Sequence, residues 1–180
     1  MHCSENLSAG GDRVYGTGVM KRVYVETSVV SYYCARPSRD LVVAAHQQIT
    51  RDWWESRLDS VYEPVISDEV LDEISQGDAE AIAKRQAAVA RMRLLPATED
   101  VRRAAMLFAT ALKLPVGAFS DALHIAFAVV FACDYLATWN CKHIAGAEAQ
   151  ERIESVCVEN ALPMPRFCTP EQLMEVCDEG

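Results

Sequence analysis

The chain has 180 residues, of which 51% are hydrophobic and 24% are charged, and its formal net charge is −9. This length and composition are typical of one globular domain with a sizeable core. The acidic balance argues against broad, sequence-independent binding of nucleic acid, which requires a basic surface, and it suits a partner that offers Arg or Lys. It does not exclude a nuclease whose carboxylates are neutralised by a metal ion.

Membrane insertion and secretion are both disfavoured by the sequence. The longest apolar stretch, residues 122–133, is too short to span a bilayer, and no basic start is followed by an apolar run as in a secretory signal. The seven cysteines are an odd number and include no C-x-x-C pair, so we expect free thiols in the cytoplasm. Cys141 and His143 alone lack the second half of a tetrahedral zinc site.

Hydrophobic periodicity predicts alternating strands and helices after an N-terminal segment. Residues 1–19 are rich in Gly and Ser and lack periodicity, so we expect a disordered extension to a single domain over residues 20–180. Asp40, Thr98 and Ser120 are expected helix N-caps. We expect strands at 22–26, 61–66, 94–96, 135–138 and 166–168, and helices at 41–54, 68–77, 79–92, 98–114, 121–133, 148–161 and 170–176.

This alternation predicts a three-layer α/β/α sandwich with a mainly parallel central sheet. In such sheets, ligands gather at the carboxyl ends of the strands. The sequence has no GxGxxG or Walker-type loop, so it gives no support to a nucleotide cofactor.

Two glutamates are candidate metal ligands. Glu26 ends the first expected strand among valines, where a carboxylate is costly to bury unless it is paired or metal-bound. The alternatives for Glu26 are a solvated strand end or a helix cap. Glu73 flanks the apolar stripe of helix 68–77 that Val70, Leu71 and Ile74 define, so we expect it to face the sheet, with an ordinary surface residue as the alternative.

Two further polar residues follow later in the chain. Asp121 begins a helix that is apolar nearly all round, so it is either a ligand, a first-turn acid stabilised by the helix dipole, or both. Asn140 follows an expected strand and either makes a turn or completes a ligand set. We interpret His124 as a satisfied buried histidine rather than a ligand. Four such oxygen-bearing side chains suggest a site for a hard divalent cation.

Three hydroxyls and several basic groups accompany these candidates. Thr27, Ser28 and Thr138 are expected to orient the carboxylates, with local capping as the alternative for Ser28. Arg36, Arg39, Lys142 and His143 would either contact substrate phosphates or simply be solvated.

Four segments in order resemble the PIN-domain family, specifically the VapC-type toxins of type II toxin–antitoxin pairs. The matching segments are VETSV at 25–29, ISDEVLDEI at 66–74, SDALHIA at 120–126 and LATWN at 136–140. The resemblance covers residues 22–144. It implies Mg²⁺- or Mn²⁺-dependent endoribonuclease activity, with Glu26, Glu73 and Asp121 as acidic ligands and Asn140 at the fourth place. The family usually has Asp where this chain has Glu26, and often an acid where it has Asn140.

These departures keep two other functions open: a catalytically weak binding or regulatory module of the same fold, and a metal phosphohydrolase of small phosphoesters. The expected partners are an RNA substrate, a second copy in a homodimer and, by resemblance, a cognate antitoxin that offers Arg or Lys near Glu73 and Asp121. The helix with Trp53 and Trp54 would form the homodimer face, unless both side chains belong to the core.

Overall fold

The computed structural model describes residues 20–176. The extension expected over residues 1–19 and the last four residues, 177–180, lie outside the described residues.

Five parallel strands form the sheet of the described part. Their spatial order is β3-β2-β1-β4-β5, and every neighbouring pair runs parallel. The strands are β1 (Lys21–Val25), β2 (Tyr62–Ser67), β3 (Arg93–Leu95), β4 (Tyr135–Ala137) and β5 (Arg166–Cys168). The predicted α/β class with a parallel central sheet is therefore confirmed.

Strand β1 occupies the centre because its side chains are apolar on both faces. Val23, Tyr24 and Val25 are fully buried, as expected for a strand covered by helices on each side. The chain first adds β2 and β3 on one side of β1 and then crosses to add β4 and β5 on the other. The strand order thus reverses between β1 and β4, which is where open parallel sheets bind ligands.

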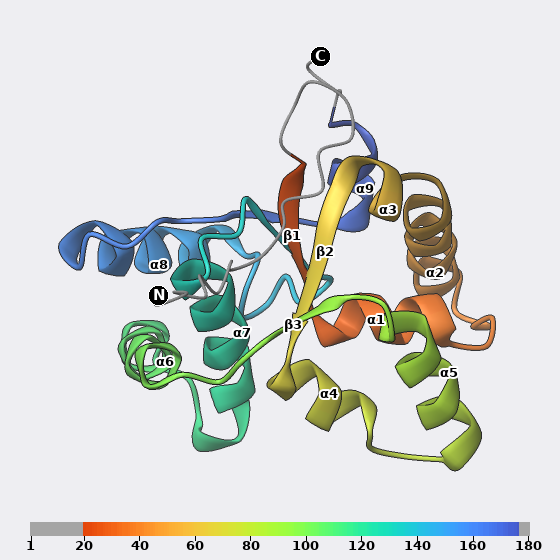
Figure 1. Ribbon diagram of the computed structural model, residues 1–180, viewed down its shortest axis with the longest axis horizontal. Coiled ribbons are helices and arrows are strands. Elements are labelled where there is room, and N and C mark those ends of the chain that lie inside the picture. Colours follow the sequence, from red (N-terminus) through yellow and green to blue (C-terminus); the bar gives the residue numbers. More distant parts are fainter. Residues whose placement is uncertain (1–19, 177–180) are drawn as a thin grey trace, which may run out of the picture.

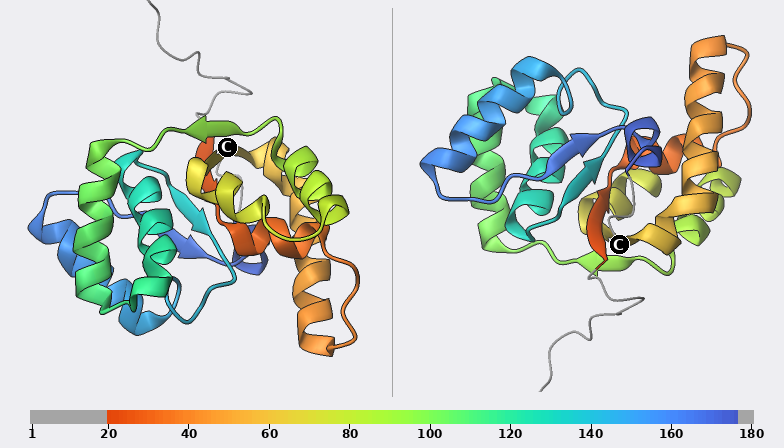
Figure 2. Two further views of the ribbon diagram at one scale, coloured as in Figure 1. Left: turned by 90° about the horizontal axis from the view of Figure 1, so that it is seen from below. Right: turned by 90° about the horizontal axis from the view of Figure 1, so that it is seen from above.

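Helices cover both faces of the sheet. Figure 1 shows α6, α7 and α8 on one side of the strands and α1 to α5 on the other, and the two views of Figure 2 agree. The helices are α1 (Thr27–Cys34), α2 (Leu41–Trp53), α3 (Asp59–Val61), α4 (Asp68–Ile74), α5 (Ala79–Val89), α6 (Glu99–Leu112), α7 (Phe119–Val130), α8 (Ala147–Glu159) and α9 (Pro170–Met174), with a π-helical turn η1 (Trp54–Leu58) and a 3₁₀ turn η2 (Val116–Ala118).

Two of the expected helix caps are confirmed and one is wrong. The Asp40 carboxylate accepts the N–H groups of Val42 and Val43, and the Thr98 hydroxyl accepts that of Val101. The prediction that Ser120 caps α7 is wrong. Because η2 runs directly into α7, the helix already begins at Phe119, and Ser120 and Asp121 lie in its first turn.

The two adjacent tryptophans belong to the core. Trp53 is fully buried, and Trp54 stacks on Tyr33 with ring centroids 4.4 Å apart. The core alternative therefore holds for Trp53, whereas Trp54 is partly buried and packs against the core. In contrast, the first turn of α2 exposes Leu41 and Val42.

Within residues 20–176, no helix has both the length and the hydrophobicity needed to cross a bilayer. The cysteines of this part are all free thiols: Cys34, Cys133, Cys141, Cys157 and Cys168.

Candidate metal centre

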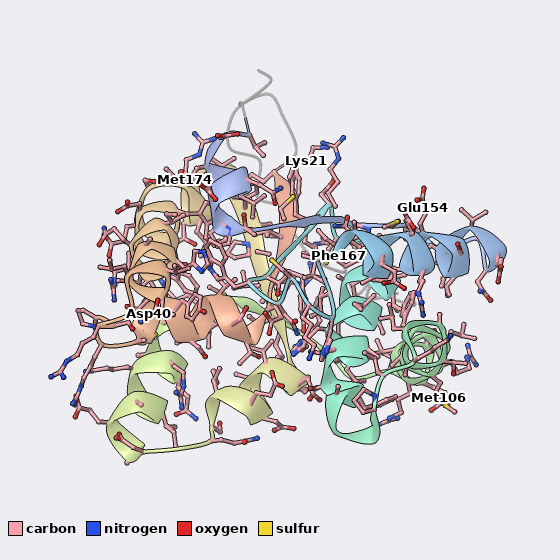
Figure 3. The ribbon with its side chains drawn as sticks, turned by 180° about the vertical axis from the view of Figure 1, so that it is seen from behind. Lys21, Asp40, Met106, Glu154, Phe167 and Met174 are labelled. Atoms are coloured by element: carbon pink, nitrogen blue, oxygen red, sulfur yellow. The ribbon has the colours of Figure 1, made fainter. Side chains whose placement is uncertain are left out.

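The candidate residues lie at the carboxyl ends of β1 and β4. In Figure 3, the label Lys21 marks the first residue of β1, and the centre lies at the other end of this strand, where α1 begins. Helix α4 follows β2 at the same edge, and α7 packs against α4. The sheet and two helices therefore bring segments that are distant in sequence to one place.

Glu26 is a buried carboxylate held by three donors. It is the N-cap of α1, the residue is 5% exposed, and its side chain accepts the Ser28 N–H at 3.1 Å. The hydroxyls of Ser28 and Thr138 both donate to Oε2, that of Thr138 at 2.7 Å. The helix-cap alternative is thus correct, whereas the solvated strand end is not.

Glu73 projects from α4 toward the same place. Its Oε2 accepts the Thr27 hydroxyl and lies 2.9 Å from His124 Nε2. Burial raises the pKa of Glu73, but hydrogen bonds from His124, Thr27 and Ser120 and the charge of His124 outweigh burial and lower it below its ordinary value of 4.5. Glu73 is thereby favoured as an anion, and the surface-residue alternative fails.

His124 is buried between the two glutamates and Tyr24. Its Nδ1 lies 2.8 Å from the Tyr24 hydroxyl, and its Nε2 is 4.0 Å from Glu26 Oε1. Burial lowers the pKa of His124, but the hydrogen bond to Glu73 and the surrounding carboxylates raise it above its ordinary value of 6.5. Burial raises the pKa of Tyr24 well above 10.0, so its hydroxyl stays protonated.

Asp121 forms the second half of the centre with Asn140 and His143. Asp121 Oδ1 accepts the Asn140 side-chain amide at 2.8 Å, and Oδ2 lies 2.7 Å from His143 Nδ1. The side-chain carbonyl oxygen of Asn140 in turn accepts the backbone N–H of His143 at 3.1 Å. Asn140 therefore orients Asp121. The side-chain carbonyl oxygen of Asn140 still has one lone pair that no hydrogen bond of the described part uses.

Two hydroxyls connect the halves. Thr138 donates to Glu26 and accepts the Asn140 backbone N–H at 2.9 Å. Ser28 donates to Glu26 and accepts the Trp139 N–H at 2.9 Å. With the bond from Thr27 to Glu73, all three hydroxyls expected to orient carboxylates do so.

The donor set fits a hard divalent cation. One ligand atom each from Glu26, Glu73 and His124 lie within 4.8 Å of one another. Asp121 is not a member of this cluster. In an octahedral Mg²⁺ site, adjacent ligands are about 3.0 Å apart and opposite ligands about 4.2 Å apart, so these side chains must move closer together to bind one ion. The carboxylates supply the oxygen ligands that Mg²⁺ and Mn²⁺ prefer.

No Lys or Arg of the described part compensates the three carboxylates. Among residues 20–176, their ion-pair partners within 4.0 Å are His124, beside Glu26 and Glu73, and His143, beside Asp121. A Lys or Arg at such a site would compete with a metal ion, and His124, whose pKa the neighbouring carboxylates raise, competes in the same way when it is protonated. The local field therefore favours an external cation.

The structure adds two histidines to the residues singled out from the sequence. The two ring nitrogens of His124 have partners, as a satisfied histidine requires, yet one partner is a candidate ligand. The sequence signal that could have identified His124 as part of the site is its position one helical turn after Asp121. His143, for which both a phosphate contact and simple solvation were open, contacts Asp121, and Arg36 pairs with Glu80. Their partners are distant in sequence, so spacing alone did not reveal them.

Neither a scan against protein-family models nor a search of curated proteins returns a match for this chain. The functional argument therefore depends on the geometry of the site and on the four segments described above.

Proposed function

We propose that this protein is a divalent-metal-dependent endoribonuclease that hydrolyses RNA phosphodiester bonds. Glu26, Glu73 and Asp121 would hold Mg²⁺ or Mn²⁺, with Asn140 at the fourth place. The observation that carries the proposal is the pairing of Glu26 and Glu73 at the switch point of a parallel sheet. Thr138 and Asn140 link Glu26 to Asp121, and no Lys or Arg of the described part forms an ion pair with these carboxylates.

The roles of the residues follow from their contacts. Glu26 is fixed by Ser28 and Thr138, so its carboxyl group is already oriented in the site. Glu73 is held by Thr27 and His124. Asn140 aligns Asp121 and would also position a water molecule. When bound, the ion neutralises the phosphate and lowers the pKa of its coordinated water.

RNA as the substrate and a toxin–antitoxin role come from the resemblance to VapC-type toxins. The acidic site would repel an RNA phosphate unless a cation were present, so substrate binding should require the metal. The free thiols agree with the cytoplasm as the place of action. The proposed antitoxin would place an Arg or Lys against Glu73 and Asp121, where it would mimic the charge of the ion.

The test is cleavage of a mixed single-stranded RNA pool with Mg²⁺ or Mn²⁺, with and without EDTA. We expect metal-dependent cleavage by the wild-type protein. In Asp121→Ala, cleavage should fall by at least the roughly 100-fold that loss of an outer-shell partner can cost. Equal cleavage by both proteins would remove the proposed site.

A second candidate is a catalytically weak binding module of the same fold. It is favoured by the two hydrogen bonds that engage both ends of the Asn140 side chain, because they leave less capacity for a metal or water. Metal-dependent RNA binding without cleavage, in the same assay, would select this candidate.

A further inference from the structure

A second polar feature adjoins the candidate metal centre: a cavity of about 410 Å³ between the end of α6 and the start of α8. Lys113, Lys142 and Arg152 contribute basic groups to its lining. His143 also lines it, and this residue contacts Asp121 at 2.7 Å. One side chain therefore both lines the cavity and contacts a candidate ligand.

The two lysines of this cavity are not neutralised by the described part of the protein. Within residues 20–176, Lys21 and Lys84 form ion pairs with Asp134 and Glu80, whereas Lys113 and Lys142 form none. Unpaired ammonium groups in one cavity of a chain with net charge −9 create a local positive field. Such a field selects an anion.

Lys113 adopts a backbone conformation that is uncommon for residues other than glycine. It adopts a left-handed conformation, with φ 53°, and ends α6. Its backbone N–H caps the end of α6, and this fixes the start of the Lys113 side chain at the cavity.

Arg152 and Glu148 are the other charged residues that line the cavity, and they form an ion pair with each other. Arg152 donates to the Ala111 carbonyl at 3.1 Å and to Glu148 at 2.6 Å, so these contacts fix it in place and offset its charge. The net positive charge then comes from the two lysines. Helix α8 adds backbone N–H groups at the same cavity, because no side chain caps its first turn.

We propose that this cavity binds a phosphate of single-stranded RNA next to the phosphodiester bond at the metal centre. The proposal rests on the ribonuclease function proposed above. Lys113 and Lys142 contact the phosphate as point charges, and His143 separates this phosphate from the one at Asp121. The contact is independent of base identity, so it adds affinity and register rather than sequence preference.

The experiment measures binding of a fluorescent single-stranded RNA pool by anisotropy, in Ca²⁺ and at several KCl concentrations. All proteins keep the proposed ligands, Ca²⁺ supplies the charge of the ion in place of Mg²⁺, and gels verify that the RNA stays intact. The test variant carries Lys113→Asn, which tolerates the left-handed backbone, and Lys142→Gln. The matched control carries Lys21→Gln and Lys84→Gln, which remove the same charge elsewhere.

For the test variant, we expect weaker binding and a salt dependence of log K that is shallower by about 0.7 for each phosphate that the protein no longer neutralises. The control should keep the wild-type slope. Equal slopes in the test variant and the control would overturn the inference, as would a wild-type protein that binds no RNA. If the slope falls but the wild-type protein cleaves no RNA, the phosphate site stands and the nuclease proposal fails.

Discussion

Glu26 depends on hydroxyl groups rather than on a basic partner. Ser28 and Thr138 donate to its carboxylate, and Thr138 also accepts the backbone N–H of Asn140. Neutral donors orient the carboxyl group without placing a competing positive charge beside it. The hydroxyl of Thr138 therefore matters to both halves of the centre.

Replacing Thr138 with valine tests this dependence. The substitution keeps the shape but leaves the Asn140 N–H without its acceptor and Glu26 with one donor fewer. We expect the metal-free protein to lose about 1–3 kcal/mol of unfolding free energy in urea denaturation. Calorimetric titration should give an affinity for Mg²⁺ that is lower by about 10- to 100-fold.

Thr110→Val is the matched control, because its exposed hydroxyl bonds only a carbonyl of its own helix, that of Met106. Its unfolding free energy should stay within about 0.5 kcal/mol of wild type, with unchanged metal affinity. If Thr138→Val behaved like this control, the hydroxyl would have no part in the centre.

The pair of His124 and Glu73 gives the metal-free protein a defined pH dependence. Tyr24, Glu26 and Glu69 face the same imidazole, and the carboxylates among them favour its charged form. Because the pKa of His124 is raised, its stabilisation is complete below its ordinary value of 6.5 and is lost as the pH rises through the folded-state pKa. Because the pKa of Glu73 is lowered, its stabilisation is present above 4.5 and is lost as the pH falls through the folded-state pKa.

We therefore expect the pair to stabilise the protein most between pH 4.5 and 6.5, the ordinary values of the two groups. The measurement is the difference in unfolding free energy between wild type and His124→Gln in EDTA. The packing change in the variant is independent of pH, so the pH profile isolates the charge. A difference that grows as the pH rises from 6.5 would contradict the assignment.

At the scale of elements, the segment between β4 and α8 holds the second half of the centre. The backbone carbonyl of Asn140 accepts the N–H groups of Ile144 and Ala145, and Gly146 ends the turn as the N-cap of α8. A Cβ at Gly146 would lie 2.6 Å from the Cys141 carbonyl oxygen, so any other residue must displace this turn. Glycine is thus required by a close backbone approach.

Gly146→Ala should lower both the stability and the RNA-cleaving activity of the protein. We expect a loss of about 1–3 kcal/mol in unfolding free energy from the forced displacement. RNA cleavage should fall by up to about 100-fold, because Asn140 and His143 move away from Asp121.

Gly117→Ala provides the comparison, since a Cβ there meets nothing within 4 Å. Its stability and activity should match wild type. Full activity in Gly146→Ala would show that the turn does not position the site.

Local signals predicted most elements because they act within a few residues. The buried run of Val23, Tyr24 and Val25 indicates a central strand, and Asp40 and Thr98 form the caps expected of them. The prediction that Ser120 caps α7 was wrong because a 3₁₀ turn precedes the helix and the helix begins at Phe119. The residues around Ser120 carry no sequence preference that indicates this turn.

At the scale of the whole molecule, the strand order explains why Glu26 meets Glu73 and why Thr138 and Asn140 connect Glu26 to Asp121. Glu26 and Asn140 follow neighbouring strands on either side of the switch point, and α4 and α7 bring Glu73 and Asp121 to the same edge. The sequence alone predicted that Glu26 and Asn140 follow strands and that Asp121 lies near the start of a helix. It did not predict the partners of the acids, because the contact of His124 with Tyr24 joins residues 100 apart in sequence and that with Glu73 joins residues 51 apart. Such contacts depend on how the helices pack.

The central claim is that these side chains bind one or more divalent cations, and anomalous diffraction from a crystal of the protein soaked in Mn²⁺ tests it most directly. The account predicts anomalous peaks at about 2.0–2.3 Å from carboxylate oxygens of Glu26, Glu73 or Asp121, the range expected for such ions. It also predicts that Asp121→Ala weakens these peaks. Peaks only at other carboxylates, or none at a Mn²⁺ concentration that supports RNA cleavage, would contradict it.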